Sequence, residues 1–166
     1  MLGNRSAVAT AMAAVVIGAT AFANPFAGRA VKSPPWLSIE APVNPFDAHV
    51  RGAVFLVHAT THEGIPRVAD ISGAAEGIVG STRRSIPLSF EPTDRPGVFA
   101  VRRQWPAEGT WMARISLLTT TALVTFDRTG NVASARVPTE PQSGVQIPRA
   151  VAAREIDSTL AEAARR

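Results

Sequence analysis

Between Trp36 and Val137, short runs of β-branched and aromatic residues alternate with Gly, Pro, Asn and Asp at intervals of roughly eight to twelve residues. This spacing is typical of antiparallel sandwiches and barrels, because each run can form one strand and each breaker group one turn. Strands are predicted over Trp36–Ala41, His49–Ala59, Arg67–Gly73, Ile86–Phe90, Gly97–Gln104, Thr110–Leu118, Thr121–Phe126 and Val132–Val137. We therefore expect residues 36–137 to form an all-β domain, an immunoglobulin-like antiparallel β-sandwich of about seven or eight strands.

Two of these runs show the strict alternation of half-buried strands. Every second position is apolar: Ile86, Leu88 and Phe90 in one run, and Trp111, Ala113, Ile115 and Leu117 in the other. By contrast, Ala53–Val57 is apolar throughout, which predicts either a central strand covered on both faces or an edge strand packed by a terminal helix. Pro87 has no amide proton to donate to a sheet ladder, so it favours an edge position.

Residues 1–23 have the composition of an export signal peptide. Arg5 precedes a long uncharged stretch rich in Ala and Val, and the small residues of Ala21-Phe22-Ala23 suit signal peptidase. We expect cleavage before Asn24, a linker over residues 24–35, and a location in the periplasm or outside the cell. The alternative is an uncleaved membrane anchor, because no charged residue lies between Arg5 and Arg29. In that case the N-terminal segment would be the only membrane contact.

Composition excludes several kinds of site. The chain contains no cysteine, so disulfides, thiolate nucleophiles and thiolate metal sites are excluded. The formal net charge is only +4 and the charges are scattered, which argues against nucleic acid as a partner. Gly73–Arg84 lacks the lysine of a phosphate-binding loop and is expected to be a Gly-rich connection between strands. Because no nucleophile elbow or paired carboxylates occur either, we expect neither catalysis nor a cofactor.

The chain beyond Val137 changes character twice. Residues 138–147 are polar and rich in breakers, so a linker is predicted there. A final helix is expected over residues 148–166, because Pro148 suits a first helical turn. Its apolar residues form one narrow stripe of Ala152, Ile156, Leu160 and Ala163. The stripe leaves three roles open: docking on the parent domain, self-association or partner binding, and a frayed tail.

Histidines are the candidate metal ligands. His58 and His62 lie four residues apart with Glu63 beside them, and His49 is the third histidine. Residues four apart in a strand are separated by about 13 Å, so a shared ion requires the strand to end before His62. A loop over Thr60–Gly64 would allow this. Metal handling, with copper or zinc bound by His49, His58, His62 and Glu63, is therefore the alternative function.

Trp36 and Trp105 are the candidate interaction residues. Each has a proline as its neighbour, Pro35 and Pro106 respectively, which favours partial exposure. Trp111, by contrast, lies on the apolar face of a predicted strand and is expected to be in the core.

The run from Arg95 to Leu117 contains Pro96-Gly97-Val98-Phe99 and, further on, Gln104-Trp105-Pro106-Ala107-Glu108-Gly109-Thr110-Trp111. It resembles exported bacterial immunoglobulin-like domains, notably the YtkA-like and CopC-like sandwiches and some macroglobulin-type modules. Gly64-Ile65-Pro66-Arg67-Val68-Ala69-Asp70 is similar to a loop and strand of the same domains. The resemblance implies a sandwich, and some such domains bind copper through ends rich in Met and His. This chain departs from them, since Asn24 is not His and Met112 is the one methionine after the signal.

These observations favour a non-enzymatic, exported binding module of the bacterial cell envelope. Its partner would be a protein or an envelope component, reached through loops and an edge strand. Metal handling by His49, His58 and His62 is the alternative, and it ranks second because the sequence supplies few metal ligands.

Overall fold

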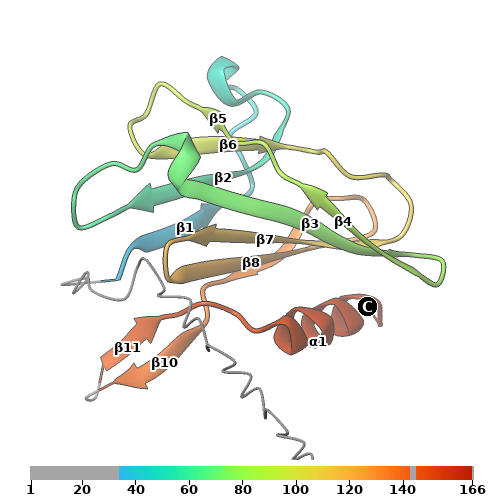
Figure 1. Cartoon of the computed structure of the whole chain (residues 1–166). Helices are drawn as coiled ribbons and strands as arrows, with labels where there is room; N and C mark the ends of the chain where they lie inside the picture. Colours follow the sequence, from blue (N-terminus) through green and yellow to red (C-terminus); the bar gives the residue numbers. More distant parts are fainter. Residues whose placement is uncertain (1–33, 143–144, 166) are drawn as a thin grey trace, which may run out of the picture. The chain divides into compact units, whose positions relative to one another are not determined.

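The computed structural model describes residues 34–142 and 145–165. The predicted signal peptide and all but the end of the linker before Trp36 lie outside these residues. The strands are β1 (Trp36–Glu40), β2 (Ala53–Thr60), β3 (Ile71–Val79), β4 (Thr82–Pro87), β5 (Glu91–Pro92), β6 (Val98–Arg102), β7 (Thr110–Leu117), β8 (Thr120–Phe126), β9 (Val132–Arg136), β10 (Thr139–Gln142) and β11 (Val145–Pro148). The helical elements are η1 (Ala48–Val50), η2 (Val68–Asp70) and α1 (Ala153–Ala163) (Figure 1).

Two antiparallel sheets form the domain. One has the strand order β1-β2-β6-β5 and the other β4-β3-β7-β8-β9. Immunoglobulin constant domains hold strands A-B-E-D in one sheet and C-F-G in the other. The order β1-β2-β6-β5 corresponds to the first sheet and β3-β7-β8 to the second, with β4 and β9 as added edge strands. The predicted all-β sandwich with a C-terminal helix is therefore confirmed.

The core lies between the inner faces of these sheets. Its largest members from the β1-β2-β6-β5 sheet and from the β3-β7-β8 strands are Leu37, Phe55, Val57, Phe99, Val101, Trp111, Ile115, Leu117, Val124 and Phe126. In β7, Trp111, Ala113, Ile115 and Leu117 all belong to this cluster, whereas Arg114 and Ser116 lie on the other face. The alternation predicted for this strand is therefore confirmed.

Strand β2 is buried on both faces, as its apolar composition predicts. It lies between β1 and β6, and its outward residue Leu56 is covered by Val50, which follows the loop after β1, and by Val98 and Ala100 of β6. The strand begins at Ala53 rather than at His49. His49 belongs to η1, where the carboxylate of Asp47 accepts its backbone N–H at 2.9 Å and stabilises a local turn.

Strand β3 extends well beyond its predicted end at Gly73. The predicted Gly-rich connection is wrong, because Gly73 and Gly77 lie inside β3 and only Gly80 lies at the turn into β4. Gly77 is required by packing: a Cβ there would lie 2.3 Å from Cε3 of Trp111. Composition alone cannot distinguish a glycine that makes room for a ring from one that makes a turn. Pro87 ends β4 at the sheet edge, as predicted.

The predicted linker over residues 138–147 contains a hairpin instead. β10 and β11 pair antiparallel, with Thr139 opposite Pro148. The hairpin is attached at its base, where the Arg149 N–H donates to the Pro138 carbonyl and the Thr121 N–H to the Arg149 carbonyl. Pro148 therefore ends a strand rather than opening a helix, and α1 begins five residues later at Ala153. The composition of this segment, rich in breaker residues, did not indicate a strand pair that is joined to β8 through Thr121.

Helix α1 docks on the outer face of the larger sheet. A second apolar cluster holds it there, made of Met112, Leu123, Ile156 and Leu160. Arg83 pairs with Asp157 of the helix, and Arg136 donates to the Thr159 hydroxyl at 2.6 Å. Docking on the parent domain is thus the role that the structure shows for the apolar stripe. No helix in residues 34–142 or 145–165 is long and apolar enough to cross a membrane.

Trp105 is buried, so the prediction of partial exposure is wrong for this residue. Its side chain is 4% exposed and stacks on Phe126, with ring centroids 4.4 Å apart. Trp105 lies in the connection between β6 and β7, and its ring packs on Phe126 at the end of β8. The sequence does not reveal this contact, because Phe126 is distant from Trp105 along the chain. Trp36 is 65% exposed, in agreement with its prediction.

Trp105→Ala and Trp111→Ala are expected to lower the free energy of unfolding by similar amounts, about 3–5 kcal/mol each, because both remove a buried aromatic side chain. Trp36→Ala is the matched control and should change it by less than about 0.5 kcal/mol. Denaturant unfolding of the three variants measures this. A loss for Trp105→Ala as small as for Trp36→Ala would contradict the packing of Trp105 on Phe126.

Candidate functional site

The predicted metal ligands lie on separate elements. His49 is in η1, His58 is on β2, and His62 and Glu63 follow in the loop between β2 and β3. Within the part of the chain that the structure describes, no group of three or more His, Asp or Glu side chains could hold a metal ion. The structure therefore does not bring these four residues together, and it assigns a different partner to His58.

His58 belongs to a charged cluster on the outer face of the smaller sheet. Its Nε2 lies 2.6 Å from Oε2 of Glu40 on β1, and Nη1 of Arg95 lies 3.3 Å from the same oxygen. Burial disfavours the ionised carboxylate, but hydrogen bonds from His58 and Arg95, together with the Arg95 charge, outweigh it and lower the pKa of Glu40 below its ordinary value. The cluster joins β1, β2 and the loop before β6. Sequence reasoning missed Glu40 and Arg95 because they are distant from His58 along the chain.

Glu40→Gln is expected to lower the free energy of unfolding at pH 7 and to lower it less at pH 3. The pKa of Glu40 is lower in the folded protein than its unfolded value of 4.5, so its stabilising contribution is complete above that pH and is lost as the pH falls through the folded pKa. Denaturant unfolding of both proteins at the two pH values tests this. If the two proteins differ in free energy of unfolding by the same amount at pH 3 and pH 7, ionisation of Glu40 does not contribute to stability.

A groove of about 500 Å³ lies where the two sheets separate, between the end of β1 and β9. Its lining is formed by Ile39, Ala41, Pro42, Val43, Ala53, Val54, Gly130, Asn131, Val132, Ala133, Ser134 and Ala135. None of these side chains is charged, and most are small. We call this the β9 groove.

β9 is the edge strand beside this groove, and among the described residues it pairs only with β8. Its outer side therefore presents backbone donors and acceptors to solvent. Ala135 lies opposite the core residue Val124, so its side chain is on the face that borders the groove. The site thus combines a strand edge that no described strand covers with an uncharged groove beside it.

The other edge of the same sheet is protected. β4 carries Arg83 and Arg84 and ends at Pro87, residue types that prevent edge-to-edge pairing. β5, an edge of the smaller sheet, has only two residues, Glu91 and Pro92. β9 has neither proline nor a charge before Arg136, at its end. It is therefore less protected than either of these edges.

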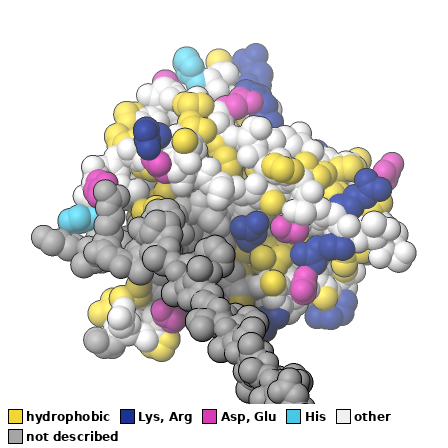
Figure 2. Space-filling model, viewed as in Figure 1, with side chains coloured by type: hydrophobic (Ala, Val, Ile, Leu, Met, Phe, Trp, Pro, Cys, Tyr) yellow, Lys and Arg dark blue, Asp and Glu magenta, His cyan; other side chains and the backbone are white. Residues whose placement is uncertain are grey.

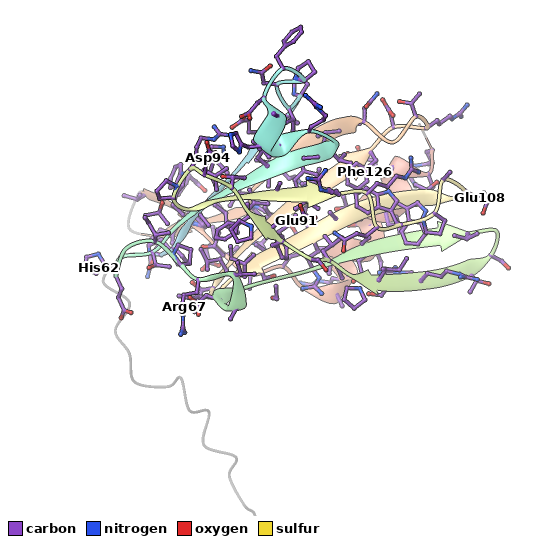
Figure 3. The ribbon with its side chains drawn as sticks, turned by 90° about the horizontal axis from the view of Figure 1, so that it is seen from above. His62, Arg67, Glu91, Asp94, Glu108 and Phe126 are labelled. Atoms are coloured by element: carbon purple, nitrogen blue, oxygen red, sulfur yellow. The ribbon has the colours of Figure 1, made fainter. Side chains whose placement is uncertain are left out.

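A second candidate surface lies at one end of the sandwich. Its exposed apolar side chains are Trp36 (65% exposed), Ile65 (60%), Val68 (37%) and Leu118 (61%). We call these four residues the apolar end. His62 and Arg67 mark this end in Figure 3, and Glu108 marks the opposite one.

The topology brings these four residues to the same end. Trp36 opens β1 opposite Thr60, the last residue of β2, and the loop that follows carries Ile65 and Val68. Leu118 follows β7, whose Leu117 pairs with the first residue of β3. The Thr120 hydroxyl donates to the Pro35 carbonyl at 2.7 Å, which joins the start of β8 to the start of β1.

Leu118 occupies an unfavourable position for its type. It is the first residue of the two-residue turn between β7 and β8 and has a φ of 51°. Glycine is preferred at such positions, because a Cβ in the left-handed region is strained. Leu118 is 61% exposed, so burial of its side chain offsets little of that strain.

Elsewhere the charges are mixed. In Figure 2, acidic and basic side chains are interspersed around α1 and the adjacent sheet edge, without a large patch of one sign on this face. Arg83 with Asp157 and Arg149 with Glu155 are ion pairs of this region. This face therefore suits the contact of α1 with its own sheet rather than the capture of a polyanion.

Comparison with protein-family models, curated proteins and solved structures found no match. The functional argument therefore depends on the β9 groove and the apolar end themselves.

Leu118→Gly is expected to raise the free energy of unfolding by about 1 kcal/mol, because glycine adopts the positive φ without strain. Leu118→Ala is the matched control: it removes the same side chain beyond Cβ but keeps the strain, and should change stability by less than about 0.5 kcal/mol. Thermal and denaturant unfolding measure both variants. A destabilised glycine variant would show that the leucine side chain contributes to the fold.

Proposed function

We propose that this protein is an exported, non-enzymatic interaction module of the bacterial cell envelope that binds an extended segment of another protein along β9. The observation that carries the proposal is the unprotected edge of β9 beside the uncharged β9 groove. Sandwich domains recognise extended peptides in this way, by adding them to a sheet as a further strand.

Recognition would use two properties of the edge. Backbone groups on the outer side of β9 supply hydrogen bonds that any extended segment can satisfy, which gives affinity without demanding a sequence. Alternate side chains of the added strand would enter the groove between Ile39, Val54 and Val132. Because the lining is small and uncharged, the preferred segment has small apolar residues at alternate positions and no charge among them.

Two further observations support this function over the alternative. Residues 1–23 have the composition of an export signal, and export would bring the domain to where envelope proteins assemble. The imidazole of His58 is engaged by Glu40, and the other predicted metal ligands lie on other elements. We also propose, from the run Gln104–Trp111, that the domain is related to the YtkA-like and CopC-like sandwiches. The copper binding of some of those domains is not part of the proposal.

A photo-crosslinking residue at Ala133, which lines the β9 groove, tests the proposal in envelope preparations. Ala133 should cross-link to a protein of the envelope, whereas the same residue at Arg84 on β4 should not. Ala135→Lys places a charge on the groove-facing side of β9 and is expected to reduce cross-linking from Ala133 roughly tenfold, the effect of losing about 1.4 kcal/mol of binding free energy.

Ser85→Lys on the opposite edge is the matched control and should leave the yield unchanged. Equal cross-linking from Ala133 and Arg84, or a yield insensitive to Ala135→Lys, would reject binding along β9.

A further inference from the structure

A second cavity borders β9 on its other face. It measures about 140 Å³, and its lining includes Ser134 and Arg136 of β9 together with Thr159 and Glu162 of α1. Arg136 lies opposite Leu123, whose side chain packs against α1, so this cavity is on the outer face of the larger sheet. We call it the α1 cavity. Because the β9 groove lies on the inner face, β9 has a cavity on each of its two faces.

A strand added along β9 would present its side chains to these two cavities in turn, because successive side chains point to opposite faces of a sheet. A residue opposite Ala135 would face the β9 groove, since Ala135 lies opposite the core residue Val124. The residue opposite Arg136, one position further along, would face the α1 cavity. Two consecutive residues of the bound segment would therefore meet different surroundings.

Arg136 brings a positive charge to the α1 cavity. Its Nη2 donates to the Thr159 hydroxyl at 2.6 Å, and within residues 34–142 and 145–165 it forms no ion pair. Two other arginines that contact α1 differ in this respect, because Arg83 pairs with Asp157 and Arg149 with Glu155. Arg136 is thus a cation on the edge strand that no described carboxylate neutralises through an ion pair.

The position of Arg136 decides which charge of the α1 cavity the added strand meets first. Arg136 belongs to β9 itself, so it is a direct cross-strand neighbour of an added residue, whereas Glu162 lines the cavity from the helix. Opposite charges on directly facing positions of neighbouring strands stabilise their pairing. The surroundings therefore complement a negative side chain opposite Arg136.

We infer, on the basis of the proposed function, that the segment bound along β9 carries an aspartate or glutamate opposite Arg136, next to a small apolar residue opposite Ala135. The small residue enters the β9 groove, and the carboxylate pairs with the guanidinium on the other face. Backbone hydrogen bonds along β9 are indifferent to sequence, so this pair of positions supplies specificity. The partner is a protein with an exposed segment in which small apolar residues alternate with polar ones, one of them acidic.

Two synthetic peptides test the inference on the full chain. Both alternate alanine or valine with threonine and have blocked ends, and they differ only at one threonine position, which holds glutamate in one and glutamine in the other. The glutamate peptide should bind about threefold more tightly, the effect of an ion pair exposed to solvent. Added salt should reduce the difference. Fluorescence anisotropy of the labelled peptides measures both affinities, and the photo-crosslinking residue at Ala133 reports whether they lie along β9.

Variants of Arg136 assign the preference to its charge. Arg136→Gln should remove the preference for the glutamate peptide, and Arg136→Lys, which keeps the charge, should retain it. Arg136→Glu should prefer a peptide with lysine at the same position. Arg84→Gln, on the opposite edge of the sheet, is the matched control and should bind both peptides as the unaltered chain does. Denaturant unfolding verifies that each variant is folded.

Equal affinities of the two peptides, with cross-linking from Ala133 that is sensitive to Ala135→Lys, would overturn this inference alone. A preference that persists in Arg136→Gln would do the same, as would one that appears only when the C-terminal carboxylate of the peptide is left unblocked. If neither peptide cross-links from Ala133, binding along β9 is rejected, and the inference with it.

Discussion

The contact of Trp111 with Gly77 is the interaction on which the sandwich depends. The two residues are opposite each other in the pairing of β3 with β7, and the indole occupies the space where a side chain at residue 77 would lie. The indole Nε1 also donates to the Glu108 carbonyl at 2.7 Å, which orients the ring as the chain enters β7. The ring is therefore buried in the core between the two sheets while its one polar atom stays satisfied.

The edges of the two sheets explain where binding is possible. A sandwich has strand edges that expose backbone groups, and each edge must be protected or used. Short length and proline protect β5, and arginines with a proline protect β4. β9 has small residues and borders an uncharged groove instead. Among the described residues, the two sheets of the sandwich have four edges in all, and the rule that protects β4 and β5 leaves β1 and β9. Of these two, β9 contributes the longer run of residues to the groove, which makes it the candidate for recognition.

The cluster of Glu40, His58 and Arg95 shows why a sequence is a poor guide to histidine function. Spacing along the chain suggested that His58 and His62 could share an ion, but the neighbours of a strand residue are on adjacent strands. Glu40 reaches His58 from β1, and Arg95 reaches Glu40 from the loop before β6. The imidazole consequently joins β1 and β2 of the smaller sheet. Of the four residues of the apolar end, the sequence indicated Trp36 alone, because the other three are brought to this end by loops between strands.

The sequence by itself determined the features that depend on nearest neighbours: the all-β class, the inward face of β7 from Trp111 to Leu117, and the edge position of Pro87. Alternation and a missing amide proton act within one strand, so they can be read locally. The tertiary structure alone decided the burial of Trp105, the β10–β11 hairpin and the β9 groove. Each of these depends on a partner distant in sequence, such as Phe126 for Trp105, and only the packing of the two sheets brings such partners together.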